Sequence, residues 1–470
     1  MPFMPVFLWT DILIYLLLAI VAAAVVYIRK RPHLVTPWKM VLQRKRGMIS
    51  VMILVCYVVI GLMDSMHFRP LLDGEGDSST RHYSSEVISV FDLLAQPLRQ
   101  KVEKTYSAPF ASRLYVKEMQ TDKAGNIIYD YPRLKYGAAH LNDNEQKWQD
   151  IRQTMLKATW LSLLLLLATY ACHLMLSAWR SRQQMASEAK RILRNHSPYP
   201  LRTFYLVLFV LLWVALNLIM LSANYHVFGT DKVGQDVLYQ ALKSVRTGLV
   251  IGTLTTLVML PLAILMGIAA GYFRGWIDDV IQYIYTTLNS IPGVLLIAAA
   301  VLILQVYMNN NPEQFETIAE RADMRLLFLC IILGVTSWTG LCRILRAETL
   351  KLREAEYVLA SRALGSGSFS ILHKHILPNL MHLVLIAVVL DFSGLVLAEA
   401  VLSYVGVGVD PSMISWGNMI NSARLEMARD PVVWWSLTAA FISMFILVLA
   451  ANLFADVVRD AFDPRMQGAG

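Results

Sequence analysis

Two acidic side chains inside an apolar stretch are the residues with the clearest potential for chemistry. Asp391 and Glu399 lie within 382–404, which otherwise has the composition of a membrane span. An ionisable group facing lipid is costly, so such acids usually line a protein interior or a water-filled cavity. They are eight residues apart, about two helical turns, and are expected on one helix face. If these two acids bound protons, the protein would be an ion-coupled secondary transporter. We favour the simpler interpretation that the acids pair across a helix interface or cap the outer bend.

Other catalytic signatures are absent from the sequence. It contains no G-x-x-x-x-G-K-[ST] phosphate loop and no G-x-S-x-G nucleophile motif. His373 and His375 are two residues apart, would point to different sides of a helix, and have no third ligand nearby. We therefore predict no catalytic residue, no metal site, no cofactor and no ATP site of that kind on this chain.

Composition indicates the class of protein. Of 470 residues, 56% are hydrophobic and only 16% are charged, whereas about 25% of residues are charged in typical soluble domains. The four cysteines all lie in or beside apolar segments, which argues against a disulfide framework. The net charge of +8 comes from basic residues clustered beside apolar segments, where membrane orientation explains them better than nucleic-acid binding. We expect an all-α polytopic membrane protein.

Apolar segments long enough to cross a bilayer recur along the chain. Basic residues follow the first segment at Arg29 to Arg31 and none precedes it, so we expect an uncleaved anchor with its N-terminus outside. Counting crossings then places 352–380 and the C-terminus in the cytoplasm. The nine expected spans are 6–28, 49–66, 158–178, 204–223, 247–272, 280–308, 326–341, 382–404 and 433–454.

Two spans carry residues that shape a helix bundle. Gly252, Gly267 and Gly271 lie in 247–272, where missing side chains permit close helix contact. Pro292 lies inside 280–308 and bends that helix by removing a backbone donor. Broken helices persist in membranes where protein or a water-filled cavity surrounds them, so we expect Pro292 next to a pore; a structural kink explains it nearly as well.

A long polar region divides the spans. Residues 67–157 are too many for a simple connection, and we expect a helix from Glu86 to Lys104 and a hairpin around Asp122 to Asn126. A cap that packs on the spans is favoured over a docking surface for a partner. The expected division is 1–66 as N-terminal spans, 67–157 as an extracytoplasmic domain, 158–202 as a span followed by a basic cytoplasmic loop (Arg180, Arg182, Lys190, Arg191, Arg194 and Arg202), and 203–470 as the core.

The segment 352–380 is a charged, helix-forming loop between two spans, within a cytoplasmic loop at 345–380. Helix formers run from Lys351 to Leu364, Gly365 and Gly367 are stop signals, and a second helical run is closed by Leu377-Pro378. We expect a compact amphipathic knob that rests on the membrane surface or on a partner protein. One face is expected to carry Glu354, Arg362 and Lys374, and the other Tyr357, Val358, Ala360, Ala363 and Leu364.

These motifs resemble a known family. Ala360-Ser361, Gly365 and Leu377-Pro378 resemble the cytoplasmic EAA loop of importer permeases of the ATP-binding cassette (ABC) class. Tyr357-Val358 and the run 362–365 resemble its dipeptide, oligopeptide and nickel branch. Leu359 replaces the usual acid of that loop, and Ser361 replaces the second alanine, which affects the details of docking contacts.

A second resemblance lies in the outer segment Phe228 to Leu238, which is similar to the signature of the second, C-type permease of peptide importers. Gly229 and Gly234 bracket a tight polar turn. Asp231 and Asp236 either cap helix starts, which we favour, or bind a neighbour. From about residue 204 the resemblance is continuous.

The resemblance implies a six-helix permease core preceded by about three additional spans and an extracytoplasmic insert. It implies a bacterial inner-membrane importer of di- or oligopeptides, with a sister permease, two ABC ATPase subunits or domains and an extracytoplasmic solute-binding protein. An ion-coupled secondary transporter and a nontransporting membrane scaffold are the alternatives. The residues expected to contact the ATPase are Tyr357, Ala360, Arg362, Ala363, Leu364, Gly365 and Pro378; Pro292, Asp391 and Glu399 are expected beside the pore.

Overall fold

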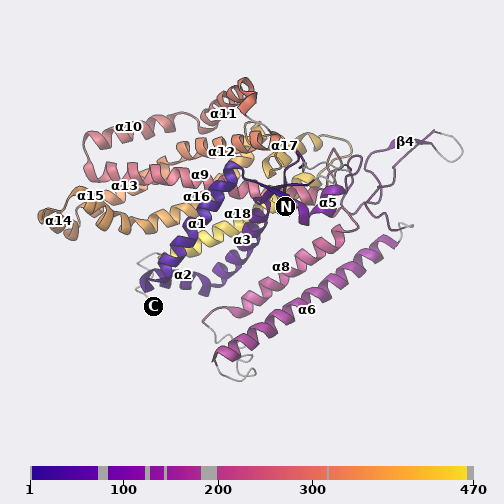
Figure 1. Ribbon diagram of the computed structural model, residues 1–470, viewed down its shortest axis with the longest axis horizontal. Helices are drawn as coiled ribbons and strands as arrows, with labels where there is room; N and C mark the ends of the chain where they lie inside the picture. Colours follow the sequence, from indigo (N-terminus) through magenta and orange to yellow (C-terminus); the bar gives the residue numbers. More distant parts are fainter. Residues whose placement is uncertain are drawn as a thin grey trace, which may run out of the picture.

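The protein is built almost entirely of helices (Figure 1). The computed structural model describes residues 3–71, 83–121, 127–141, 146–181, 198–314 and 317–462. Within these ranges nine helical stretches are long and apolar enough to cross a membrane, and each overlaps one predicted span. The prediction of an all-α polytopic membrane protein is therefore confirmed. The stretches are Trp9–Arg29, Lys45–Asp64, Lys147–Trp179, Leu201–Ser222, Val237–Phe273, Gly293–Asn310, Ile318–Arg353, Ser368–Val405 and Trp435–Phe462.

The first three helices pack on the rest of the bundle rather than apart from it. Helix α1 (Trp9–Arg29) lies against α12 and α9, and α2 (Pro32–Gln43) packs on α18. Helix α3 (Lys45–Asp64) is inserted more deeply, with contacts to α9 and α18. Arg44, just before α3, also forms a salt bridge of 2.5 Å with Asp460 near the end of α18. The N-terminal helices thus contribute to the same bundle as the C-terminal ones.

In the described parts of the polar region after α3, the helices and strands are short. Strand β2 (His67–Pro70) pairs antiparallel with β1 (Phe3–Val6) and with β3 (Ile88–Ser89). The predicted helix from Glu86 to Lys104 is wrong: β3 is followed by two short helices, α4 (Val90–Leu94) and α5 (Gln96–Gln100).

Local signals explain this correction. Ser89 accepts a hydrogen bond from the Asp92 N–H and forms a capping box that starts α4. Pro97 belongs in a first helical turn, so a new helix begins at Gln96. The predicted hairpin is confirmed, since β4 (Glu118–Thr121) pairs antiparallel with β5 (Ile127–Asp130). Its turn, 122–126, lies outside the described residues.

Two long helices form an antiparallel pair at the side of the bundle (Figure 1). Helix α6 (Lys147–Ser181) packs on α8 (Leu201–Ser222), and α8 contacts α3. Because α6 already begins at Lys147, the expected domain boundary at 157 falls inside this helix. The basic loop residues from Arg182 to Arg194 lie outside the described residues.

Helix α9 (Val237–Phe273) is the centre of the bundle. It packs on α3, α10, α12, α13 and α16. At 37 residues it is about 55 Å long, well beyond the roughly 30 Å of a hydrocarbon core. A Cβ on Gly267 would lie 2.9 Å from the Cys342 oxygen, and one on Gly271 would lie 2.6 Å from Thr349 Cβ. The prediction that glycines permit close helix contact is confirmed here, and also at Gly252, where a Cβ would lie 2.5 Å from the Phe392 ring.

The expected span 280–308 is divided in two. Helix α10 (Trp276–Ser290) ends before Pro292, and α11 (Gly293–Asn310) begins after it. Ile291 is extended, as a residue before proline prefers, and the proline supplies no N–H to continue the ladder. The prediction of a single bent helix is therefore wrong; the helix is fully interrupted, and Pro292 itself is exposed on this chain.

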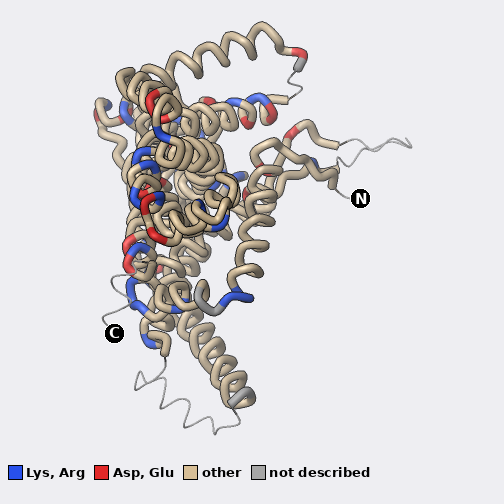
Figure 2. Tube along the Cα trace, turned by 90° about the vertical axis from the view of Figure 1, so that its left-hand side faces the viewer, with Lys and Arg blue, Asp and Glu red and all other residues tan. Residues whose placement is uncertain are grey.

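The remaining elements complete the bundle and its two ends. One end carries α14, α15, α2 and the C-terminus, and the other carries α5, α17, β4 and the N-terminus (Figure 1). Figure 2 looks onto the first end and shows how sparse charged residues are along the helices. The elements are a 3-10 turn (Pro312–Gln314), α12 (Ile318–Ser337), α13 (Thr339–Arg353), α14 (Glu356–Ala363), α15 (Ser368–Ile371), a π-helical turn (Leu372–Ile376), α16 (Leu377–Val405), α17 (Trp416–Glu426) and α18 (Trp435–Phe462).

Replacing Gly271 by alanine tests the contact between α9 and α13. The new methyl group has no room, so the Gly271→Ala variant is expected to lose about 1–3 kcal/mol of stability. Gly394→Ala is the matched control, since a Cβ there meets nothing and alanine favours a helix. Thermal unfolding of the purified proteins should show a lower Tm for Gly271→Ala and an equal or higher Tm for Gly394→Ala.

Candidate functional site

The segment 352–380 forms a projection at one end of the bundle. Helix α13 ends at Arg353, whose guanidinium donates a hydrogen bond of 2.8 Å to the Tyr272 carbonyl. Ala355 is extended, and α14 starts at Glu356 in a new direction. The prediction of one continuous helix from Lys351 to Leu364 is therefore wrong. Tertiary contacts hold the break, because Glu354 also pairs with Arg274 at 3.2 Å.

Helix α14 ends as the sequence predicted. Gly365 has a φ of +81°, a left-handed conformation that favours glycine. Its N–H donates to the Arg362 carbonyl at 3.0 Å, and the Ser366 N–H donates to the Ser361 carbonyl at 3.1 Å. This pair of bonds is the Schellman motif. A Cβ on Gly365 would contact nothing, so glycine is required at this position only for its backbone conformation.

The second helical run does not close where the sequence predicted. Helix α15, the π-helical turn and α16 form one uninterrupted helical stretch from Ser368 to Val405. Pro378 lies in the first turn of α16, where a missing N–H is tolerated, and the π-helical turn precedes it. The projection therefore continues directly into a membrane-spanning helix, without a flexible joint.

The tip of this projection is an exposed surface. All of the residues expected to contact a partner are exposed: Tyr357, Ala360, Arg362, Ala363, Leu364, Gly365 and Pro378. Leu364 is 86% exposed and Phe369 is 82% exposed. We did not predict Phe369, although an aromatic residue two positions after Gly367 in a polar loop is a usable signal. Val358, expected on the same face as Tyr357, is instead buried and anchors α14.

Arg362 has no ion pair within the described residues. Glu354, which we expected on the same face, pairs with Arg274 and not with Arg362. The guanidinium remains available on the surface. Tyr357 receives a hydrogen bond of 3.2 Å from the Asn379 amide, which ties α14 to the first turns of α16.

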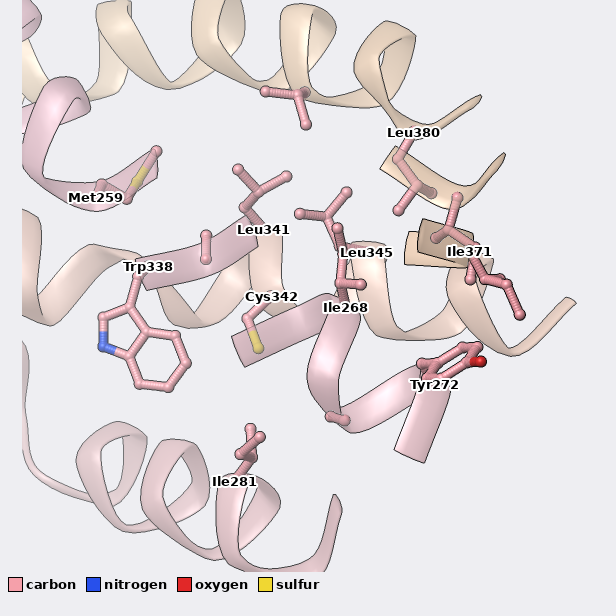
Figure 3. Packing of buried hydrophobic residues seen from close by; sticks show 14 of the residues in the cluster. Met259, Ile268, Tyr272, Ile281, Trp338, Leu341, Cys342, Leu345, Ile371 and Leu380 are labelled. Atoms are coloured by element: carbon pink, nitrogen blue, oxygen red, sulfur yellow. The ribbon is translucent and has the colours of Figure 1, made fainter. Parts of the chain in front are cut away.

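Beneath the tip lies a buried apolar cluster, shown in Figure 3. Ile371 and Leu380 come from the projection and α16, Leu345 comes from α13, and Ile268 comes from α9. An ion pair reinforces the rim, with Arg346 Nε 2.5 Å from Asp278 Oδ1 and Arg346 Nη2 2.7 Å from Asp278 Oδ2. Close-packed interiors of this kind transmit displacement rather than absorb it. The cluster therefore joins the projection to α9, α13 and α16.

The outer signature closes the opposite end of α9. Asp236 caps this helix, accepting hydrogen bonds from the Leu238 and Tyr239 N–H groups at 2.8 and 3.3 Å. This confirms the favoured interpretation, but Asp236 also binds a neighbour, His226 Nδ1, at 2.7 Å. Asp231 closes the turn between the glycines, accepting from the Val233 and Gln235 N–H groups.

Both glycines of the signature have positive φ, +71° at Gly229 and +77° at Gly234. A Cβ on Gly234 would lie 1.8 Å from the Glu103 carbonyl oxygen, and one on Gly229 would lie 2.4 Å from the Ser107 oxygen. The glycines therefore serve two purposes. They form the turn, and they admit the polar region that precedes α6.

A buried charged group joins that region to the signature. Glu103 accepts backbone hydrogen bonds of 2.9, 2.7 and 3.0 Å from residues 135, 136 and 137. His226 Nε2 lies 3.5 Å from Glu103 Oε1, too long for a good hydrogen bond but close enough for an ion pair. Burial opposes both charges, yet these partners lower the pKa of Glu103 to about 2 and, together with Asp236, raise the pKa of His226 to about 9.

The two intramembrane acids have different environments. Glu399 is buried and accepts hydrogen bonds from the Ser403 and Ser415 hydroxyls at 2.8 and 2.9 Å. Ser415 in turn caps α17, so Glu399 holds the outer bend, as the favoured interpretation predicted. Asp391 is partly exposed and lines a cavity of about 590 Å³ between α13 and α16.

Sequence reasoning missed a charged group between α1 and the core. The buried Arg246 donates to Asp11 at 2.7 Å and to the Thr10 hydroxyl at 3.0 Å, and lies 3.7 Å from Asp323. Asp11 also binds His67 at 2.7 Å. A usable signal was present, because isolated charges occur near the outer ends of three spans. Within the described residues, no cluster of His, Cys, Asp and Glu could hold a metal ion.

The bundle of long apolar helices defines a polytopic membrane protein with an exposed projection at one end. Residues 263–468 match the model of the family "binding-protein-dependent transport system inner membrane component". The chain is 30% identical to a glutathione transport system permease protein of Pectobacterium atrosepticum over 59% of its length and 90% of that protein. It is 30% identical to a dipeptide transport system permease protein of Bacillus subtilis (52% and 69%) and 31% identical to an oligopeptide transport system permease protein of Mycobacterium bovis (51% and 76%).

The chain belongs to this family of binding-protein-dependent transport permeases. It is the membrane-spanning permease subunit of an ABC importer and is not itself an enzyme. The ABC permease assignment made from the loop motifs and the outer signature is confirmed.

Replacing Gly365 by alanine tests the end of α14. The left-handed backbone is unfavourable for alanine by about 1 kcal/mol, which is about a fivefold change in the local opening equilibrium. Gly367→Ala is the matched control, because Gly367 has a φ of −64° and equal space around it. Amide exchange at 365–366 should be faster in the first variant only; equal exchange in both would contradict the assigned Schellman motif.

The buried charged group predicts how the stability of the outer region depends on pH. The pKa of His226 is raised from 6.5 to about 9, so its contribution is complete below pH 6.5 and is lost as pH rises through 9. The pKa of Glu103 is lowered from 4.5 to about 2, so its contribution is complete above pH 4.5 and is lost toward pH 2.

Resistance of the outer region to protease is therefore expected to be greatest between pH 4.5 and 6.5. The variant His226→Gln should lose the alkaline decline while keeping the acid one. An unchanged alkaline decline in that variant would assign it to another group.

Proposed function

We propose that this permease imports di- or oligopeptides across a bacterial inner membrane. The names of its relatives, which include dipeptide and oligopeptide transport permeases, support this solute class. The outer signature at Phe228 to Leu238 supports the C-type position in a pair of permeases. A sister permease, two ABC ATPase subunits or domains and an extracytoplasmic solute-binding protein complete the proposed importer.

In the proposed orientation the N-terminus lies outside and the C-terminus lies in the cytoplasm. The basic residues Arg29 to Arg31 at the end of α1, and Arg343 to Arg353 along α13, support it through the positive-inside rule. The region 67–157 is then extracytoplasmic, next to the outer signature. The projection formed by α14 and α15 faces the ATPases.

The observation that carries the mechanism is the stiff connection between this projection and the spans. We expect a groove of the ATPase to hold Tyr357, Arg362 and Leu364. Phe369, which is also exposed, joins these candidates. Motion of the ATPase dimer would move the tip, and the cluster around Leu345 would pass that motion to α13 and α16. Rigid-body rocking of these helices against the sister permease would open the pore to alternate sides.

The other candidate residues have supporting roles in this proposal. Pro292 interrupts the span next to the pore, which separates the motion of α10 from that of α11. Glu399 and the outer signature hold the external ends of α16 and α9. Asp391 faces a cavity that the moving helices enclose.

The function is tested by uptake of a labelled dipeptide into proteoliposomes that contain the complete importer. Uptake should require ATP and persist with a protonophore, whereas an ion-coupled transporter would lose it. Leu364→Asp should reduce uptake at least tenfold, because a charge replaces the most exposed apolar residue of the tip. Leu425→Asp, on an exposed leucine of α17 at the other end, should retain uptake. Normal coupling in Leu364→Asp would remove the projection from the mechanism.

A further inference from the structure

The cavity that contains Asp391 is lined by both small and large side chains. It has a volume of about 590 Å³ and lies between α13, which leads into the projection, and α16, which leads out of it. Gly340, Ala347 and Ala387 form part of its wall, and a Cβ on Gly340 would meet nothing. Pockets for small molecules in proteins have volumes of about 300–1,000 Å³. A dipeptide has room in this cavity.

Two opposite charges line the cavity without being paired. Asp391 and Arg343 both contribute to its wall. Within the described residues, neither side chain has a hydrogen bond or ion pair, with each other or with any other group. Asp391 lies within the apolar helix α16, where an uncompensated carboxylate is costly, whereas Arg343 is exposed on this chain. Such charges persist where water or a ligand compensates them.

The second large cavity shows the contrast. It has a volume of about 660 Å³ and lies between the outer ends of α1, α9 and α12. Its basic residues are already neutralised, Arg246 by Asp11 and Lys243 by Asp64 at 3.6 Å. That arrangement fastens α1 to the core and leaves no free charge of either sign for a solute. The cavity between α13 and α16, by contrast, is lined by a positive and a negative group that are not paired with each other.

We propose that the cavity between α13 and α16 is a solute-binding site for a small zwitterionic peptide. The carboxylate of Asp391 receives the α-ammonium group, and the guanidinium of Arg343 binds the α-carboxylate, each through charge-assisted hydrogen bonds. This inference rests on the proposed peptide transport. It also connects binding with coupling, because the projection joins the two helices whose separation sets the site.

Equilibrium binding to the purified, nucleotide-free importer complex, without the solute-binding protein, tests the site. The probes are a labelled dipeptide, its N-acetylated form and its C-terminal amide. The wild-type complex should bind the dipeptide about tenfold or more tightly than either modified form, because each modification removes one charge-assisted contact. Binding that ignores both modifications would overturn the assignment.

Single substitutions assign each contact. Asp391→Asn should abolish the preference against the N-acetyl form and keep the preference against the amide, and Arg343→Gln should do the reverse. A general loss of binding or folding would weaken all three probes equally, and would therefore count against direct contact. Glu348→Gln, which removes a charge from α13 outside the cavity, is the matched control and should keep both preferences.

The two proposals fail in different ways. If proteoliposomes with the wild-type importer do not take up dipeptides, the proposed solute class is wrong and the site falls with it. If they take up dipeptides but Asp391→Asn and Arg343→Gln leave both preferences unchanged, peptide transport stands and this site is wrong. The sister permease could instead cover both charges. The nucleotide-free wild-type complex would then not bind the dipeptide although uptake is normal, and this result would also overturn the proposed site.

Discussion

Close contact between α9 and α13 is the constraint on which the rest of the structure depends. It exists because Gly267 and Gly271 carry no side chain where the Cys342 oxygen and Thr349 approach. In a membrane, where lipid is as apolar as leucine, such intimate packing supplies much of the force that holds helices together. The contact fixes α13 against the central helix, and α13 leads directly into the exposed projection. Everything that the projection does mechanically relies on that fixed base.

Charges at the two ends of the bundle serve different purposes. At the end that carries the outer signature, buried charges are compensated: Glu103 with His226, His226 with Asp236, and Arg246 with Asp11. These groups attach the N-terminal helices and the polar region to the core, so that the additional spans and the permease core form one body. Nearer the projection, Asp391 and Arg343 stay apart and unpaired among the described residues. The paired charges attach structural elements to one another. The unpaired charges lie where we propose that a solute binds.

The projection combines an adaptable surface with a rigid root. Its tip exposes Leu364, Phe369 and Arg362, which suit a partner groove because they offer apolar area and a planar cation. Its root, around Ile371 and Leu380, is completely buried and continues into α16 without a break. A loop of flexible chain would dissipate movement; a helix packed on two others transmits it. In the proposed mechanism, this division lets the permease respond to ATP hydrolysis on a partner subunit.

Properties that depend on local chemistry were predictable from the sequence. The nine spans followed from apolar length, the stop at Gly365 and the cap at Asp236 from residue type, and the hairpin from turn residues between two short runs. The breaks at Glu354 and Ile291, the burial of Val358 and the pairing of Arg246 with Asp11 were not predictable. Each of these is decided by a neighbour distant in sequence, or by a competition between local signals that only packing resolves. The sequence by itself determined which segments cross the membrane and where helices are capped, because hydrophobic length and capping act over a few residues. The tertiary structure alone decided which charges meet and which remain free, because that depends on how helices far apart in the chain approach one another.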